Sequence, residues 1–262
     1  MLHNFKKEIL LLFYKIQKLD KKVVAVLLLI PVLQTISYYY TSPQFFRANL
    51  YSIFSDSEFV DLLEYFYWFI GDFVVLFIIP VCVIYSYFKE SPKDFGIKIG
   101  DYKFGLSISF IFFLIMIPII WFSSASEQFA VQYPYLSEAK ESWKVFVILE
   151  LGLFFYLFAW EFIWRGFMLF GLEEKFGYYA VLLQMIPFVI LHNGKPGVET
   201  FGAILGGIIL GILALRTRSY FYGVLLHFSI LFSIDFISVL RYRTEDYGNG
   251  LSSLIHIIGN LF

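Results

Sequence analysis

The chain has 262 residues, of which 59% are hydrophobic and 16% are charged, and its net charge is −1. Soluble proteins contain roughly 45–50% apolar and about 25% charged residues, so this composition excludes an ordinary water-soluble protein. The absence of a basic tract argues against nucleic acid as a partner. The single cysteine, Cys82, excludes an intrachain disulfide, and its apolar surroundings predict that it is a packing residue.

Residues 1–22 are predicted to form a basic, amphipathic segment on the cytoplasmic membrane surface. Apolar side chains recur there at helical spacing with lysines elsewhere, which is typical of helices that lie in the interface. The apolar positions are Phe5, Ile9, Leu12, Ile16 and Leu19.

Seven apolar runs follow, and we interpret each as a membrane span because about 20 apolar residues cross a bilayer. They cover residues 23–40, 65–88, 104–122, 145–172, 177–191, 201–215 and 220–240. The first run is longer than a signal-peptide core and lacks a following small-residue cleavage site, so we expect it to be retained. Residues 23–262 are therefore predicted to form a single membrane-embedded domain, an all-α polytopic bundle of about seven spans.

The lysines and arginines predict a cytoplasmic N-terminus, because positive charge is retained on the cytoplasmic side. In this orientation thirteen of the 20 Lys and Arg residues lie in cytoplasmic segments and six in external ones, and Arg165 lies inside the fourth run. We expect a multi-pass protein of the plasma membrane.

Several spans contain ionisable side chains, although a charge at mid-bilayer costs at least about 2.5–3.5 kcal/mol and persists where pairing, water or function compensates. Glu161 and Arg165 are four residues apart and share a helix face, which fits a structural ion pair as well as a functional one. The other ionisable residues at membrane depth are Asp72, Glu150, His192, His227 and Asp235.

His192 ends an apolar run and begins the polar turn of residues 193–197, so a helix is expected to break there. Broken backbone at membrane depth must line protein or a water-filled cavity. At 1.5 Å per residue, Glu161, His192 and His227 lie roughly 16, 22 and 10 Å from the cytoplasmic ends of their runs. Helix tilt could absorb this spread, so one shared site is compatible with these depths.

The sixth run contains a stripe of glycines at four-residue spacing. Such spacing lets helix backbones approach closely, and it predicts tight packing more strongly than a hinge beside a site. The glycines are Gly202, Gly206, Gly207 and Gly211.

Three short segments follow one another in the C-terminal half. They are Trp160 to Gly166, with Glu161 and Arg165; Phe188 to His192; and His227. In this order they resemble the motifs Glu-Glu-x-x-x-Arg, Phe-x-x-x-His and His-x-x-x-Asn/Asp of the CPBP intramembrane proteases, which include type II CAAX prenyl endopeptidases and bacteriocin-processing proteins. The resemblance covers a core at about residues 145–240.

Two positions depart from the family pattern. Trp160 replaces the first Glu, which is usually taken as the general base, and Leu231 replaces the Asn or Asp that usually follows the third-motif His. Trp-Glu together with the His-x-Gly-Lys-Pro stretch of residues 192–196 resembles a branch of the same superfamily, in which Glu161 is the expected base.

The resemblance implies an endopeptidase of a bacterial plasma membrane that cleaves a membrane-anchored or lipid-modified protein. We expect Glu161 to activate water, Arg165 to hold Glu161, and His192 to orient the water. His227 with Asp235 is expected to stabilise the tetrahedral intermediate. No cofactor is expected.

A zinc ion on the two His residues and Glu161 is the less favoured alternative, because the close His spacing of zinc proteases is absent.

Two other functional classes stay open. A catalytically inactive scaffold or chaperone of the same fold is supported by Trp160. A proton-coupled transporter would also place carboxylates within spans, but the chain lacks the paired, broken segments in matching halves that many transporters have.

Overall fold

The computed structural model describes residues 2–260, apart from the side chains of residues 2–5, 9, 12 and 13, and every regular element in that range is helical. The predicted all-α fold class is therefore confirmed. The α-helices are α1 (Leu2–Gln17), α2 (Lys21–Ile36), α3 (Pro43–Asn49), α4 (Val60–Phe73), α5 (Ile79–Val83), α6 (Tyr102–Ser123), α7 (Glu127–Gln132), α8 (Glu138–Glu141), α9 (Trp143–Glu161), α10 (Leu169–Phe176), α11 (Tyr179–Ile190), α12 (Gly197–Thr217), α13 (Phe221–Thr244) and α14 (Leu251–Gly259). The π and 3₁₀ segments are η1 (Ser37–Thr41), η2 (Tyr51–Ile53), η3 (Val74–Ile78), η4 (Ile84–Phe88), η5 (Pro92–Phe95) and η6 (Phe162–Met168).

Six helical segments of the described chain are long and apolar enough to cross a membrane. They are Lys21–Asn49, Val60–Phe88, Tyr102–Ser123, Trp143–Phe176, Gly197–Thr217 and Phe221–Thr244. The remaining predicted span is α11, whose 12 residues extend about 18 Å, less than the roughly 30 Å of a bilayer core. The prediction of about seven spans is thus confirmed as six long helices and one short one, and the protein is a multi-pass membrane protein.

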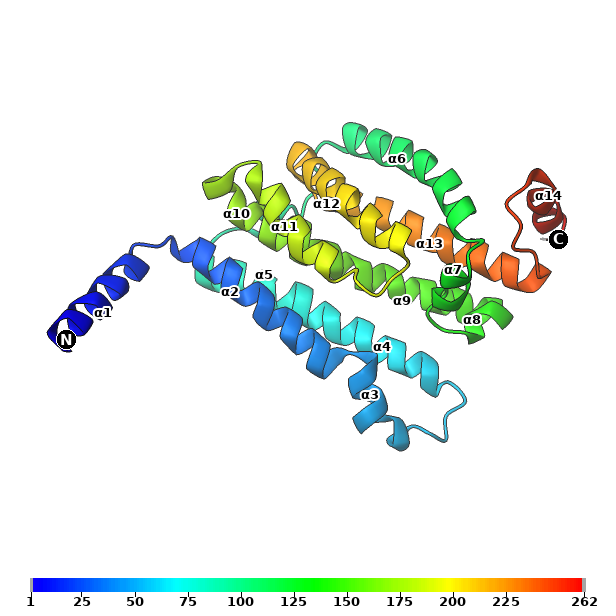
Figure 1. Cartoon of the computed structure of the whole chain (residues 1–262), viewed down its shortest axis with the longest axis horizontal. Coiled ribbons are helices and arrows are strands. Elements are labelled where there is room, and N and C mark those ends of the chain that lie inside the picture. Colours follow the sequence, from blue (N-terminus) through cyan, green and yellow to red (C-terminus); the bar gives the residue numbers. More distant parts are fainter. Residues whose placement is uncertain (1, 261–262) are drawn as a thin grey trace.

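The bundle places the helices with the sequence motifs at its centre. Helix α2 and the α4–α5 segment lie along one side, α6 lies along the other, and α9, α12 and α13 run between them (Figure 1). The short helix α11 packs mainly on α12 and also contacts η6. As a result, the chain segments of the three motifs are neighbours within the bundle.

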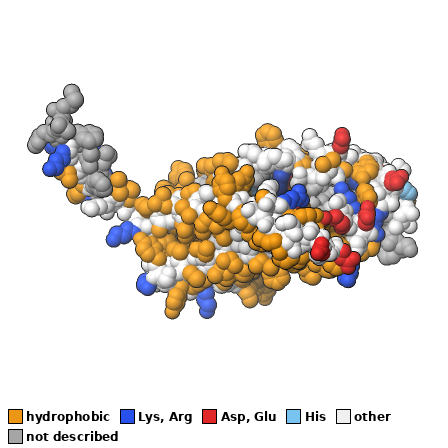
Figure 2. All heavy atoms as spheres, turned by 90° about the horizontal axis from the view of Figure 1, so that it is seen from below, with side chains coloured by type: hydrophobic (Ala, Val, Ile, Leu, Met, Phe, Trp, Pro, Cys, Tyr) orange, Lys and Arg blue, Asp and Glu red, His pale blue; other side chains and the backbone are white. Residues whose placement is uncertain are grey.

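Charged side chains gather at the two ends of the bundle. Alternation of the spans brings the loop between η4 and α6, the end of α10 and the end of α12 to the end of the bundle from which α1 leads away (Figure 1). These are predicted cytoplasmic segments with Lys and Arg residues. Figure 2 shows hydrophobic side chains over the middle of the molecule and acidic side chains at the opposite end. The assignment of the α1 end to the cytoplasm stays a prediction.

The N-terminal segment forms helix α1, which stands apart from the bundle (Figure 1). Ile16 and Leu19 are exposed, as a surface-lying helix requires. The side chains of Phe5, Ile9 and Leu12 lie outside the described residues. The placement of residues 1–22 on the membrane surface stays a prediction.

Cys82 departs from its predicted packing role, because its side chain is exposed on α5. In a helix that is apolar all around, hydropathy alone does not show which face meets the bundle.

Candidate functional site

The centre of the site is a group of three side chains on α9, η6 and α13. Arg165 Nη1 donates to Glu161 Oε1 at 2.9 Å, and His227 Nδ1 lies 2.6 Å from the same oxygen. Glu161 and Arg165 have no exposed surface, whereas the His227 side chain is 19% exposed. The ion pair expected from the four-residue spacing is therefore present, and a histidine 66 positions away completes it.

The π-helical segment η6 begins directly after Glu161 and contains Arg165. Such wide turns interrupt α-helices often at functional sites. Gly166 is needed there, because a Cβ at this position would collide with the ring of Phe162. The local backbone thus directs the guanidinium of Arg165 back toward the carboxylate of Glu161.

The ring of Phe188 packs between His192 and the group formed by Glu161, Arg165 and His227. Its ring centroid lies 4.4 Å from that of His192 and 6.1 Å from that of His227, and the guanidinium carbon of Arg165 lies 4.0 Å above the same ring. His192 is buried, and its Nδ1 is 2.7 Å from the carbonyl oxygen of Phe188. The two residues that define the predicted second motif are thus joined by a hydrogen bond.

The hydrogen-bond partners assign a tautomer to each histidine. A carbonyl oxygen can only accept, so Nδ1 of His192 carries the proton and donates to Phe188. Glu161 is paired with Arg165 and accepts in the same way from Nδ1 of His227. Burial, and after it the cation of Lys195, lowers the pKa of His192 to about 4, so this ring is neutral near pH 7. Nε2 of His192 is therefore available as a proton acceptor, and so is Nε2 of His227 in the neutral form of that ring.

A cavity of about 980 Å³ lies beside these histidines, between the α2–α4 side of the bundle and helices α6, α12 and α13. His192 and His227 line it, together with Trp160, while Glu161 and Arg165 do not. The differences in predicted depth therefore do not keep the two histidines apart, since both line one cavity. Glu161 lies behind His227 and is joined to it by a hydrogen bond.

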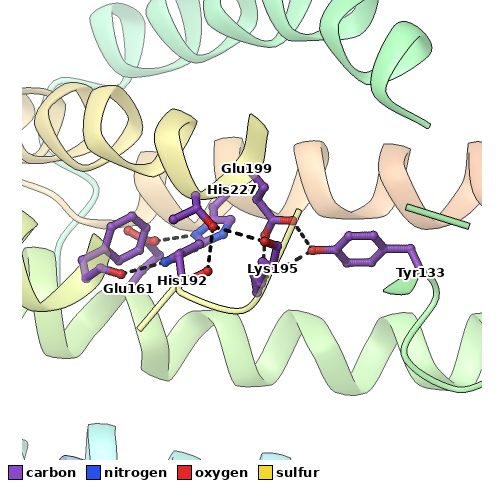
Figure 3. Close-up of polar contacts among 8 residues, drawn as sticks. Tyr133, Glu161, His192, Lys195, Glu199 and His227 are labelled. Atoms are coloured by element: carbon purple, nitrogen blue, oxygen red, sulfur yellow. Dashed lines mark hydrogen bonds and ion pairs between the residues drawn. The ribbon is translucent and has the colours of Figure 1, made fainter. Parts of the chain in front are cut away.

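Lys195 and Glu199 also line the cavity, although neither is predicted as a site residue from the sequence. Lys195 Nζ donates to Glu199 Oε1 at 2.7 Å, and the hydroxyl of Tyr133 donates to the other carboxylate oxygen (Figure 3). Burial, more than the neighbouring Tyr135 and Glu199, raises the pKa of Tyr133, which therefore remains a donor. Lys195 and Glu199 are four residues apart and follow His192 closely in the sequence. This spacing, which allows an ion pair on one helix face, was the signal by which the sequence could have indicated the pair.

Asp235 occupies a different place from the one its predicted role needs. It is fully buried and faces Glu150, and it lies eight residues beyond His227, about 12 Å along α13. Apart from each other, the two carboxyl groups have no hydrogen-bond partner within the described part of the chain. The cavity wall includes the neighbouring Leu231 and Ile234 instead. The structure therefore does not bring Asp235 together with His227.

Asp72, which had no assigned role, lines the opposite cavity wall. Its carboxylate accepts hydrogen bonds from the hydroxyl of Thr41 and from the indole nitrogen of Trp68, at 2.5 and 2.8 Å. Both carboxylate oxygens thus have partners, as a buried carboxylate requires.

The residues of the site do not fit a catalytic zinc ion. Such an ion needs three protein ligands, and no group of three His, Cys, Asp or Glu side chains among the described residues could hold a metal. Glu161, the third ligand of the alternative, instead bonds to the cation of Arg165.

The glycine stripe of α12 divides into two faces. A Cβ at Gly207 would lie 2.7 Å from Met185 Cγ, and one at Gly211 would lie 2.8 Å from Gln184 Nε2. The predicted close packing is confirmed for these two glycines. It is wrong for Gly202 and Gly206, which line the cavity and have open space where a Cβ would point.

This difference gives a matched pair of variants. We expect Gly207→Val to lower the free energy of unfolding by about 1–3 kcal/mol, because overpacking forces neighbours to move. Gly206→Val is expected to keep wild-type stability, because its side chain points into the cavity. Thermal unfolding of both purified variants in detergent checks this. Equal destabilisation by the two substitutions would contradict the assignment of faces.

Part of the chain is similar to a known protein family. Residues 141–233 match the model described as type II CAAX prenyl endopeptidase Rce1-like. No curated protein and no solved structure matches the chain. The matched range contains Glu161, Arg165, His192 and His227 and ends before Asp235. The segment that resembles this family therefore contains the whole group of residues around the two histidines.

Proposed function

We propose that this protein is an intramembrane endopeptidase that hydrolyses a peptide bond in a membrane-anchored or lipid-modified protein, near its attachment point. The observation that carries the proposal is the hydrogen bond between Glu161 and His227. It presents an imidazole held by a carboxylate to a cavity within a membrane-spanning bundle.

The proposed reaction uses His227 as the general base. Its Nε2 takes a proton from water as the water oxygen bonds to the carbonyl carbon of the substrate. The carbonyl then re-forms, the C–N bond breaks, and the leaving amine receives the proton from His227. Glu161 stabilises the imidazolium that exists between these steps, in the manner of the carboxylate in a Ser-His-Asp triad.

Arg165 and His192 have supporting roles in this proposal. Arg165 keeps Glu161 ionised and in position through its 2.9 Å ion pair. His192 offers a second unprotonated Nε2 and orients the attacking water. The sequence-based assignment had Glu161 activate water directly; here it acts through His227, because Glu161 does not reach the cavity.

The cavity wall supports a membrane-bound substrate. Apolar residues of α6 and α12 line it, and several of them keep large exposed surfaces that a lipid or an apolar helix could contact. Examples are Ile115, Ile119 and Leu205. A substrate held by a lipid or an apolar helix would thus reach the histidines from the bilayer, with the N-terminus of the enzyme in the cytoplasm of a bacterial cell.

The test compares protein termini in membrane and secreted fractions of cells that produce wild-type, Glu161→Gln or His192→Ala protein. We expect at least one new terminus that depends on the wild-type protein and is lost in both variants. Immunoblotting of the three proteins in membranes controls for their amounts.

An inactive scaffold is the second candidate, and Trp160 favours it. This side chain lines the cavity and packs on Tyr156, Trp164 and Phe188 at the position of the usual first Glu. Identical termini in all three samples would reject the protease and favour the scaffold.

A further inference from the structure

The tautomers of the two histidines leave the proposed reaction without one component. Attack of water on a peptide carbonyl turns the carbonyl oxygen into an oxyanion, which needs hydrogen-bond donors in place beforehand. In the proposed reaction His227 starts as a neutral base, so Nε2 of His227, like Nε2 of His192, accepts a proton rather than donates one. The proton that His227 gains passes to the leaving amine. A preorganised donor must therefore come from another side chain on the cavity wall.

Two Lys or Arg side chains line the cavity in the described part of the chain, Arg47 and Lys195. Arg47 lies on α3, is 63% exposed and uses its Nε for the carboxylate of Glu64 at 2.6 Å. Lys195 lies three residues after His192 in the same turn. Its position beside a histidine makes Lys195 the stronger candidate.

The ammonium of Lys195 is charged and held in place. Burial by itself lowers its pKa, but Tyr135 and Glu199 outweigh this effect, and the pKa lies above the usual value. Nζ bonds to Glu199 at 2.7 Å and to the hydroxyl of Tyr133 at 3.5 Å. An ammonium has three N–H donors. The bond to Glu199 occupies one of them, and the contacts with the hydroxyls of Tyr133 and Tyr135 are the ones that an oxyanion in the cavity would replace.

The backbone of the turn that carries His192 and Lys195 is held by the side chain of Thr200. The hydroxyl of Thr200 donates to the carbonyl oxygen of His192 at 2.8 Å and also lies 3.4 Å from that of Lys195. His192 and Lys195 are thereby tied to the first turn of α12. Such fixed placement is what oxyanion stabilisation requires, since donors that need not reorganise contribute most.

We infer that Lys195 is a catalytic residue that donates a hydrogen bond to the oxyanion formed during peptide hydrolysis, with Glu199 and Tyr133 as its positioning residues. This inference rests on the proposed function. Lys195 forms no covalent bond with the substrate. It stabilises the oxygen that receives the carbonyl electron pair, and it is released when the carbonyl re-forms and the amine leaves.

The first test replaces Lys195 by Met and by Arg and measures cleavage in detergent. The substrate is a peptide that contains the site identified by the comparison of termini, with its membrane anchor. We expect Lys195→Met to lower kcat by about 10²–10³-fold with little change in KM, because one oxyanion donor is lost. Lys195→Arg is expected to recover part of this loss. Lys144→Met, at an exposed lysine, is the matched control and should keep wild-type turnover.

The second test separates charge from folding. Lys195→Cys is made in a Cys82→Ser background, where it is the single thiol of the chain. Alkylation with 2-bromoethylamine rebuilds a side chain with an ammonium at nearly the length of lysine, whereas iodoacetamide adds a neutral amide. We expect kcat to rise at least tenfold after the first reagent and to stay low after the second.

The outcomes distinguish the two proposals. Wild-type turnover in Lys195→Met, or equal rescue by both reagents, overturns the role of Lys195 and leaves the protease standing. If the wild-type protein cleaves nothing, the proposed function falls and the role of Lys195 falls with it. A fall in thermal stability without rescue by 2-bromoethylamine assigns Lys195 to structure and also overturns the inference.

Discussion

Replacing His227 with Gln is expected to lower kcat by about 10²–10⁴-fold, the usual contribution of a general base. Gln lacks a basic nitrogen but keeps an amide that can donate to Glu161, so folding should be preserved. KM should change little, because the substrate would contact mainly the apolar cavity wall. Initial rates on the membrane-anchored peptide, together with thermal unfolding of the purified variant, provide the measurement.

Comparison with Glu161→Gln shows whether Glu161 acts through His227. If both belong to one proton-transfer unit, the double variant should be about as slow as the single His227→Gln variant, since effects within such a unit are strongly non-additive. Multiplicative losses would mean that Glu161 acts on water independently of His227. In that case the role predicted from the sequence, with Glu161 as the direct base, would describe the reaction better.

The second large effect concerns stability. Arg165→Met is expected to lower the free energy of unfolding by about 3 kcal/mol, at the low end of the roughly 3–5 kcal/mol for breaking a buried ion pair. Glu161 would be left as a buried carboxylate with only His227 as its partner. The low end applies because Nε and Nη2 of Arg165 have no partners among the described residues, so their removal offsets part of the loss. Unfolding by SDS titration in mixed micelles measures the change.

The double variant Glu161→Gln with Arg165→Met provides the control for this prediction. It removes both charges, so most of the lost stability should return, while turnover should stay at the level of Glu161→Gln. Such coupling between two contacting residues is read from the thermodynamic cycle of the four proteins. Additive destabilisation in the cycle would show that the pair is not an energetic unit.

The membrane fold could be predicted from the sequence because the hydrophobic length of each span is a local property. A run of apolar residues crosses the bilayer whatever its neighbours are, so the long spans and the short α11 could be located in advance. The ion pair of Glu161 and Arg165 was equally local, since helical geometry places residues four apart on one face.

The arrangement of the site depended on tertiary structure. No local rule shows that His227 meets Glu161 from 66 residues away, or that Asp235 faces Glu150 two turns from His227. Helix rotation and tilt decide these contacts, and in spans that are apolar all around the sequence carries little record of either.

The ionisable residues within the spans could therefore be identified from the sequence alone, since a charged residue in an apolar run stands out from its neighbours at any position. Only the packed bundle decided their grouping, with Glu161 withdrawn from the cavity and Lys195 and Glu199 brought to its wall. The physical reason is that burial cost depends on residue type and depth, whereas reactivity depends on distances between side chains on different helices.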